Sequence, residues 1–536
     1  MTVPPPNVTT PLSSTALREL VSDLAGKIAR LEQEVEQLRL DNSNLRHDNQ
    51  ALKDEIARLK NLPPRPPFKP SGMEKATQPR PTGSGRRPGR GAKRDRVTRE
   101  VTLRAEVPPG SRFKGYKTVV RRDLILTAEV VRYKRERWVT PEGQTIIAPL
   151  PLGVTGGFGP GVQRFCLALH TQGQVTTERL TDLLNGIGLS ISKREVVRLL
   201  TTDLEPFAQE DHAVLQAGLN SSPYITVDDT GARHARRPGV TTQIGGERFC
   251  VFRTSRSKSR LNFLSLLRGG CEDYVVNEAA LDYLRRQPVE AAVIARLAAH
   301  PDQAFASQLE WWQHLLQCSI NIFDRPLLQS LNEAATWGAL RHHGLMENTV
   351  VVSDDAGQFR VAQHALCWIH AERHLQKLMP GSPKQAKAVE LVREAIWCFY
   401  RSLKLWKQSP SPGGERAFRQ HFDKIFGLRT GYKDLDALLA RLARRKGELL
   451  RVLERPEIPL HTNASENDLR ACVIKRKISG GTMSADGRVA RDVMLGLLKT
   501  CRKLGLSFFT YLGDRLGLNG DQPRIPPLAV LVAREA

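Results

Sequence analysis

Leucine recurs at every seventh position near the start of the chain, the clearest hydrophobic pattern in the sequence. These positions hold Leu17, Leu24, Leu31, Leu38, Leu45, Leu52 and Leu59. The matching positions four residues later hold Val21, Ile28, Val35, Asn42, Asn49 and Ile56. Branched residues in one series with leucine in the other favour a parallel two-stranded coiled coil, and a buried Asn fixes its register. Residues 14–62 are therefore predicted to be a leucine zipper that forms a homodimer or higher oligomer. The alternative is one long amphipathic helix packed on its own body.

Residues 63–98 have the composition of a basic linker. They contain eight prolines, five glycines and ten Lys or Arg against two acids, which forbids a regular element. Within them Arg86, Arg87 and Arg90 resemble an arm that lies in a DNA minor groove. A solvated tether explains the composition equally well.

The hydrophobic pattern then changes to short apolar runs in residues 99–150. Residues 119–126 and 129–133 are rich in β-branched side chains and bounded by glycine and proline, as strands are. The segment contains no cysteine. We therefore predict a small β module without zinc ligands.

Helical spacing follows over residues 160–215. We expect helices at about 162–170, from Thr176 to the glycines near 187, and from Ser192, where Ser-Lys-Arg-Glu has capping-box spacing. Two short helices across a glycine turn are typical of a helix-turn-helix, whose second helix would present Lys193 and Arg194 to DNA. A helical hairpin that serves only packing remains an equal alternative.

Charge and cysteine usage narrow the class of protein. The chain of 536 residues has 80 Lys and Arg against 56 Asp and Glu, a net charge of +24, which points to a polyanionic partner. No run of 18 apolar residues and no signal peptide is visible. We therefore expect the polyanionic partner to be DNA or RNA and not a membrane, and the protein to be cytoplasmic. Eight scattered cysteines without a C-x-x-C pair predict neither disulfides nor a zinc ribbon.

Two short apolar segments end in paired acids. The first runs into Asp228 and Asp229, and the second into Asp354 and Asp355. An acid at the end of a buried strand lies at the rim of a sheet, where α/β proteins place ligands. Asx turns at strand exits are the simpler explanation of either pair alone.

A third acid stands near the start of a predicted helix. Asn463 is a plausible N-cap with Glu466 as its capping-box partner, and the helix is expected to end at Gly480. A carboxylate in the first turn, followed by basic residues, fits metal and phosphate equally well. Those basic residues are Arg470, Lys475, Arg476 and Lys477.

Together these motifs resemble the transposases of the insertion-sequence 66 family. They are Asp228-Asp-Thr, Ser353-Asp-Asp-Ala-Gly-Gln-Phe, Cys367-Trp-Ile-His370-Ala-Glu-Arg373-His and Asn463-Ala-Ser-Glu466-Asn-Asp-Leu-Arg470. The resemblance covers roughly residues 14–515. It implies a multidomain chain: coiled coil, β module, helix-turn-helix, then an α/β ribonuclease H-like catalytic domain at 220–382 and 456–515. The 111 residues between the second and third acids imply a helical insertion at 383–455, and a further helical stretch is expected at about 275–345. Within the insertion, apolar residues stand at helical spacing, namely Leu435, Leu439, Leu442, Leu449 and Leu453.

The family's acid triad falls on Asp228, Asp354 and Glu466, with Asp229 and Asp355 as rivals one position away. The resemblance implies a DDE transposase that cleaves the ends of a mobile element and joins the 3′-hydroxyls to target DNA. Three carboxylates of this kind hold two Mg²⁺ or Mn²⁺ ions. The basic residues after Glu466 would then hold phosphates of double-stranded DNA, with Arg470 also able to orient Glu466.

Two further points follow from the resemblance. Family members often carry a cysteine-rich zinc module after the zipper, and residues 99–150 depart from that pattern. His364, Cys367, His370 and His374 are expected near one face of a helix, which cannot surround zinc tetrahedrally, so we expect Cys367, His370 and Arg373 to support the second acid instead.

Two other classes of function stay open. They are a zipper and helix-turn-helix regulator without catalysis, and a ribonuclease H-like nuclease that does not join strands. The sequence does not say whether helper proteins of the same element take part.

Overall fold

The computed structural model describes residues 99–151, 153–154 and 156–534 of a chain that divides into two compact units, 1–120 and 121–536. The predicted zipper at 14–62 and the linker residues Arg86, Arg87 and Arg90 lie outside the described residues. In the first unit the described part, residues 99–120, forms neither helix nor strand. All elements given below belong to the second unit.

The predicted β module is present only as one small hairpin. β1 (Arg137–Val139) pairs antiparallel with β2 (Thr145–Ile147). The strands predicted at 119–126 and 129–133 are wrong, because both segments lack regular structure. Their apolar side chains are exposed, Ile125 by 85% and Val130 by 80%. A β-rich sequence pairs into a stable sheet only where one face can be buried, and these residues have no such face.

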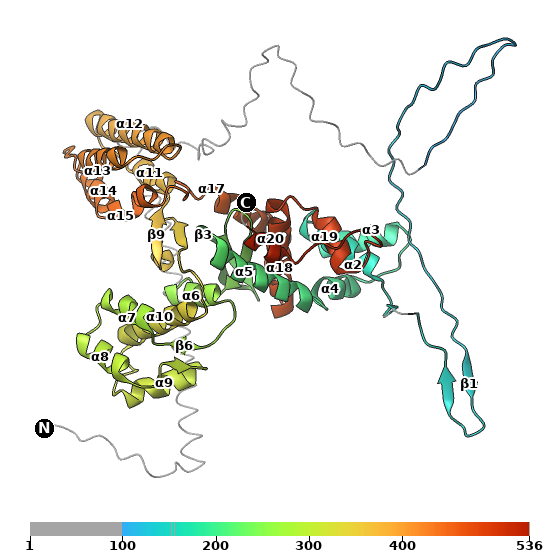
Figure 1. Ribbon diagram of the computed structural model, residues 1–536, viewed down its shortest axis with the longest axis horizontal. Helices are drawn as coiled ribbons and strands as arrows, with labels where there is room; N and C mark the ends of the chain where they lie inside the picture. The colour runs from blue at the N-terminus through green and yellow to red at the C-terminus, as the bar shows by residue number, and fades with distance from the viewer. Residues whose placement is uncertain (1–98, 152, 155, 535–536) are drawn as a thin grey trace. The chain divides into compact units, whose positions relative to one another are not determined.

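The helices predicted over 160–215 are confirmed as helices (Figure 1). They are α2 (Pro160–Thr171), α3 (Thr177–Gly186), α4 (Lys193–Thr201) and α5 (Glu205–Ser221). The capping box at Ser192 is also confirmed, because its side chain accepts a hydrogen bond of 3.2 Å from the backbone N–H of Glu195. A short chain reversal between α3 and α4 leaves the first turn of α4 exposed, as a helix-turn-helix requires.

A five-stranded mixed sheet forms the centre of the second unit, in the order β5–β4–β3–β8–β9. Its strands are β3 (Tyr224–His234), β4 (Arg237–Gly245), β5 (Cys250–Ser255), β8 (Val350–Ser353) and β9 (Gln363–Leu366). β3, β4 and β5 form an antiparallel meander, whereas β3, β8 and β9 run parallel. β8 is buried along its whole length, which explains its run of three valines.

Helices from the end of the chain cover this sheet. α17 (Asn463–Ser479) packs against β3 and β4, and α18 (Ala485–Lys503) packs against β5. α19 (Phe508–Arg515) contacts α2, and α20 (Leu528–Ala533) contacts α5. The C-terminal helices α18, α19 and α20 therefore share one hydrophobic core with α2, α3, α4 and α5.

Helical segments occupy two of the connections between these elements, as predicted. The first contains α6 (Arg260–Arg268), α7 (Glu278–Arg285), α8 (Ala291–Ala299), α9 (Gln308–Gln317) and α10 (Arg325–His342), with the short pair β6 (Tyr274–Val275) and β7 (Ala304–Phe305). η2 (Gly357–Phe359) then joins β8 to β9, and α11 (Trp368–Gln376) follows β9.

The second helical segment fills the predicted insertion at 383–455. Its helices are α12 (Pro383–Trp406), α13 (Pro412–Phe426), α14 (Lys433–Ala443), α15 (Lys446–Leu449) and α16 (Arg451–Glu454). The leucines that predicted helical spacing all lie in its buried core, namely Leu435, Leu439, Leu442, Leu449 and Leu453. The same core reaches β8 through Val350 and Val352, so this segment is packed directly onto the sheet.

Candidate active site

The register of the sheet places the first aspartates of the two acid pairs side by side. Thr226 of β3 pairs with Val352 of the parallel strand β8. Continuing this register by two residues brings Asp228 level with Asp354. Both acids thus lie at the carboxyl ends of the apolar runs of adjacent parallel strands, the edge where α/β sheets bind ligands.

Asp228 is a partly buried carboxylate in a negative environment. Burial is the main cause that raises its pKa to about 6, and the negative charge of Asp354 raises it further. The backbone N–H of Asp229, which donates 2.7 Å to Asp228 Oδ1, opposes the rise, as does the charge of His370. A carboxylate held this way gains from a bound cation, because the cation replaces the lost water and cancels the repulsion.

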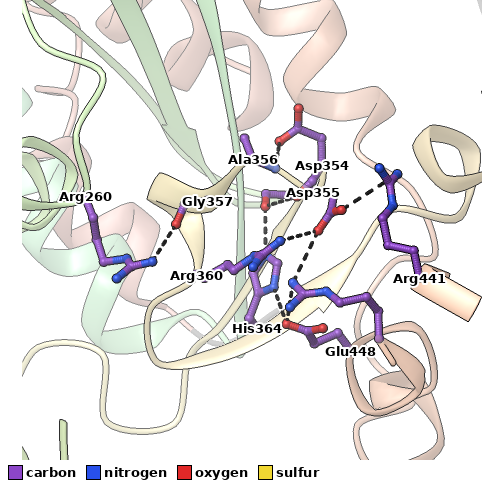
Figure 2. A network of polar contacts seen from close by, with 11 residues as sticks. Arg260, Asp354, Asp355, Ala356, Gly357, Arg360, His364, Arg441 and Glu448 are labelled. Atoms are coloured by element: carbon purple, nitrogen blue, oxygen red, sulfur yellow. Dashed lines mark hydrogen bonds and ion pairs between the residues drawn. The ribbon is translucent and has the colours of Figure 1, made fainter. Parts of the chain in front are cut away.

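The rival aspartates have other partners. Asp229 accepts from Lys258 Nζ at 2.8 Å and from Gln358 Nε2 at 2.8 Å. Asp355 forms an ion pair of 2.8 Å with Arg360. Figure 2 shows the carboxylates of Asp354 and Asp355 pointing apart, that of Asp355 toward the arginines. Asp228 and Asp229 are successive residues of the strand β3, so their side chains point to opposite faces of the sheet.

Asp354 also makes the Asx turn expected at a strand exit. Its Oδ1 accepts a hydrogen bond of 3.0 Å from the backbone N–H of Ala356. The turn engages one oxygen of the carboxylate. The two explanations of this acid are therefore compatible, since the turn holds the side chain in place beside Asp228.

Glu466 does not form the predicted capping box. α17 begins at Asn463 with Thr462 as its N-cap, so Glu466 stands one position too far along the helix to return to the cap. Its side chain instead accepts 2.7 Å from Arg373 and lies 3.6 Å from His370 Nε2. The role of orienting Glu466, which the sequence suggested for Arg470, thus falls to Arg373, since the described contacts of Glu466 do not include Arg470.

His370 connects the third acid to the first two. Its charge acts on Asp228, and Glu466 lies beside it. Burial lowers the pKa of His370, but its hydrogen bond to Cys367 and the charge of Glu466 outweigh burial and raise the pKa overall. A cationic imidazole between the acids would hold the set together when the negative charges are not otherwise balanced.

The neighbouring histidines and cysteine do not share one helix face as predicted. His364 lies in β9, and Cys367 precedes the first residue of α11, so only His370 and His374 are helical. The helix begins later than the spacing suggested, because residues 363–366 pair with β8 as a strand. His364 Nε2 lies 2.8 Å from the hydroxyl of Ser353, the residue before Asp354, whereas His370 and Arg373, which were expected beside the second acid, contact the third acid, Glu466.

The predicted phosphate contacts differ in exposure. Lys193, Arg194, Arg470 and Lys477 are exposed, and Arg476 is half-buried. Lys475 is only 4% exposed and donates 2.8 Å to the carbonyl of His170, so it is not placed to contact a phosphate. Burial lowers the pKa of Lys475 to about 8. Lys475, Arg476 and Lys477 point to different faces of the helix, and the sequence alone did not show that Lys475 is the buried one.

The three acids are suited to a divalent metal by their chemistry. Carboxylate oxygens are the ligands that Mg²⁺ and Mn²⁺ prefer. Among the described residues, the groups of three ligands within 4.8 Å of one another lie elsewhere, at His300–His314–Cys318 and Cys271–Asp273–His343. The ligand oxygens of Asp228, Asp354 and Glu466 therefore do not all lie within 4.8 Å of one another.

Sequence reasoning missed two arginines near this site. Arg441 of α14 and Arg445, which follows it, approach Asp355 from the helical insertion. Their spacing of four residues on one helix face was visible in the sequence, but nothing there indicated which acid they face.

None of the helices in the described part of the chain has both the length and the apolar character to cross a membrane.

Comparison with known proteins agrees with these features. The sequence profile described as "Transposase IS66 family" matches residues 342–490, a stretch that includes Asp354 and Glu466. The chain is also 64% identical over 323 residues to an uncharacterized protein, y4jO, of Sinorhizobium fredii, covering 60% of this chain and 100% of the relative. The chain belongs to the IS66 family of transposases.

Proposed function

We propose that this transposase is of the DDE type and uses Asp228, Asp354 and Glu466 to cleave and join DNA strands. The observation that carries the proposal is the parallel register of β3 and β8, which continues from the Thr226–Val352 pair to bring Asp228 level with Asp354, together with the raised pKa of Asp228, to which the charge of Asp354 contributes. Such a pair has no evident structural purpose, because it destabilises the fold at neutral pH. The sheet order and the helical insertion fit a ribonuclease H-like domain at 220–382 and 456–515.

Each acid has a distinct supporting environment. The Asp229 N–H fixes Asp228, and the Ala356 N–H fixes Asp354. Arg373 and His370 contact the carboxylate of Glu466. When bound, two Mg²⁺ or Mn²⁺ ions would activate the attacking oxygen and stabilise the leaving oxygen of the phosphodiester. For Glu466 to serve as a ligand, its carboxylate turns one oxygen away from Arg373.

The reaction has two stages. The 3′-oxygen of the element end is the leaving group in the first stage and the nucleophile in the second. Water first attacks the phosphorus at an element end, the P–O3′ bond breaks, and the free 3′-hydroxyl leaves with a proton. That 3′-hydroxyl then attacks a phosphorus of the target strand and displaces its 3′-oxygen. The chain forms no covalent bond to DNA in either stage.

The remaining parts of the chain would bind DNA and bring two copies together. The zipper at 14–62 would pair two chains, and the linker at 63–98 with Arg86, Arg87 and Arg90 would contact the minor groove. Lys193 and Arg194 at the exposed start of α4 would read the element end. Arg470, Arg476 and Lys477 on α17 would hold phosphates near the acids.

Strand transfer with pre-cleaved element ends in Mg²⁺ tests the proposal. We expect Asp228→Asn, Asp354→Asn and Glu466→Gln each to abolish joining and to retain DNA binding, and the losses not to add. Asp229→Asn is the matched control and should retain activity, because Asp229 is bound to Lys258 and Gln358. Loss with Asp229→Asn but not with Asp228→Asn would place the site on the other face. In a parallel assay with uncut element ends, cleavage without joining in the wild type would indicate a nuclease, and neither activity a regulator.

A further inference from the structure

Three arginines surround Asp355, one residue from the proposed catalytic Asp354 (Figure 2). The shortest contacts of the Asp355 carboxylate are 2.8 Å to Arg360 Nη2, 3.4 Å to Arg445 Nη2 and 4.0 Å to Arg441 Nη2. We refer to Arg360, Arg441 and Arg445 as the arginine cluster. One carboxylate is thus shared by three guanidinium groups.

The cluster is assembled from two distant parts of the chain. Arg360 directly follows η2, in the connection between β8 and β9. Arg441 lies in the last turn of α14, and Arg445 precedes α15, both in the helical insertion. The insertion therefore delivers positive charge to the end of β8, the strand that leads into Asp354.

The positive charges of the cluster exceed the negative charges available to them. Besides Asp355, the cluster contacts Glu448, which lies 2.7 Å from Arg445 Nη2. Three guanidinium groups thus face two carboxylates. Burial lowers the pKa of Arg445, and the charges of Arg360 and Arg441 lower it further, against the opposing effect of the acids.

Several guanidinium nitrogens in the cluster lack hydrogen-bond partners. Nε and Nη2 of Arg441 and Nε of Arg445 are buried and donate no hydrogen bond within the described residues. A buried donor without an acceptor is costly, and more so when it is charged. These nitrogens could be satisfied by an anion with several acceptor oxygens.

Buried contacts fix the cluster relative to the end of β8. His364 Nδ1 lies 3.2 Å from Glu448, and its Nε2 lies 2.8 Å from the hydroxyl of Ser353. That hydroxyl donates 2.7 Å to the carbonyl of Asp354. These contacts link Glu448, which pairs with Arg445, to β8, which leads into Asp354. The fold therefore fixes the position of Arg445 relative to Asp354.

We propose that the arginine cluster binds a backbone phosphate of the DNA strand next to the phosphodiester on which Asp228 and Asp354 act. Asp355 holds the arginines in place when DNA is absent and gives way to the phosphate when it binds. Planar guanidinium groups match the oxygens of phosphate in a fork, and arginine is favoured where that geometry matters. This inference rests on the proposed function, since it needs DNA at this edge of the sheet.

The test compares Arg441→Gln with Arg444→Gln in the full chain. Arg444 is exposed and only three positions from Arg441, so its variant removes the same charge outside the cluster. Binding to a duplex carrying an element end is measured in EDTA, where no cleavage occurs, over a range of salt. The duplexes carry a neutral methylphosphonate at one backbone position at a time, scanned around the cleavage point.

We expect Arg441→Gln to weaken binding several-fold at low salt and to reduce the magnitude of the log–log salt slope by about 0.9, the value for one phosphate. One or two methylphosphonate positions should weaken the wild type and leave Arg441→Gln unaffected. Arg444→Gln should keep the wild-type pattern of sensitive positions.

The inference is overturned if Arg441→Gln and the wild type respond alike at every methylphosphonate position. If Arg441→Gln lowers the melting temperature, Arg360→Gln is scanned in its place, and an unchanged response there overturns the inference equally. Because binding is read without chemistry, a sensitive phosphate together with absent strand transfer would contradict the proposed function and leave the phosphate site intact.

Discussion

The ionised carboxylate of Asp228 should destabilise the folded chain at neutral pH, so its removal should make the protein more stable while it abolishes strand transfer. Burial and the charge of Asp354 raise the pKa of Asp228 from 3.8 to about 6. At 1.36 kcal/mol per pKa unit, the shift corresponds to about 3 kcal/mol at pH 7. Asn keeps the oxygen that accepts the Asp229 N–H, so Asp228→Asn should recover most of that free energy.

The sign of the pH dependence follows from the direction of the shift. The folded state holds the proton more tightly than the unfolded state, so the stabilisation from protonated Asp228 is full below the unfolded pKa. It is lost as the pH rises through about 6. The advantage of Asp228→Asn should therefore be about 3 kcal/mol at pH 7.5 and only about 1 kcal/mol at pH 4.5.

Thermal melts in EDTA at the two pH values measure this difference. Asp229→Asn is the control, because Asp229 is paired with Lys258 at 2.8 Å and should gain no stability at pH 7.5. Adding Mg²⁺ at pH 7.5 should raise the melting temperature of the wild type more than that of Asp228→Asn, since only the wild type keeps the full set of charged ligands. A melting temperature of Asp228→Asn at or below that of the wild type at pH 7.5 would refute the reasoning.

Four further predictions follow from the same features. Strand transfer should fall as the pH drops through about 6, where Asp228 takes up a proton, and a rate that stays flat down to pH 5 would contradict this. The wild type should gain stability relative to Lys475→Met as the pH rises from 8 to 10, because burial lowers the pKa of Lys475 to about 8, below its unfolded value; urea titrations at both pH values measure the gain. Replacing Asn42 and Asn49 with Ile should stabilise the zipper and loosen its strand number, which sedimentation of residues 14–62 would detect. Deleting residues 63–98 should reduce the salt slope of DNA binding by several units, at about 0.9 per phosphate, whereas an unchanged slope would make the linker a tether only.

Periodic patterns predicted the helical parts of this chain well. The helical spacing of apolar residues around Leu435 and Leu449 predicted a helical insertion, and these leucines lie in its buried core. The β-rich residues around Ile125 were equally suggestive in sequence, yet they form no strand. Strand formation depends on a partner and a buried face, and neither is encoded within the segment itself.

The acids were predictable in position, whereas their partners were not. Strand ends and the motif around Glu466 pointed to all three acids in the sequence. The choice of Arg373 over Arg470 as the partner of Glu466 depends on where α11 meets α17, a contact between residues 93 apart in sequence. Lys475 was similarly indistinguishable from its neighbours until the helix had a packed side.

The hydrogen bond from Lys475 to α2 sets a fixed distance between α2, in the region proposed to bind DNA, and Glu466, a proposed catalytic acid. Lys475 donates to the carbonyl of His170 near the end of α2, while Glu466 stands nine residues earlier on the same unbroken helix. At 1.5 Å per residue the two points are about 14 Å apart, the length of about four base pairs. If α4 binds the element end, the length of this helix would set the position of the cut. The protein would then cut at a fixed number of base pairs from the bound sequence and would not need to recognise the bases at the cut itself.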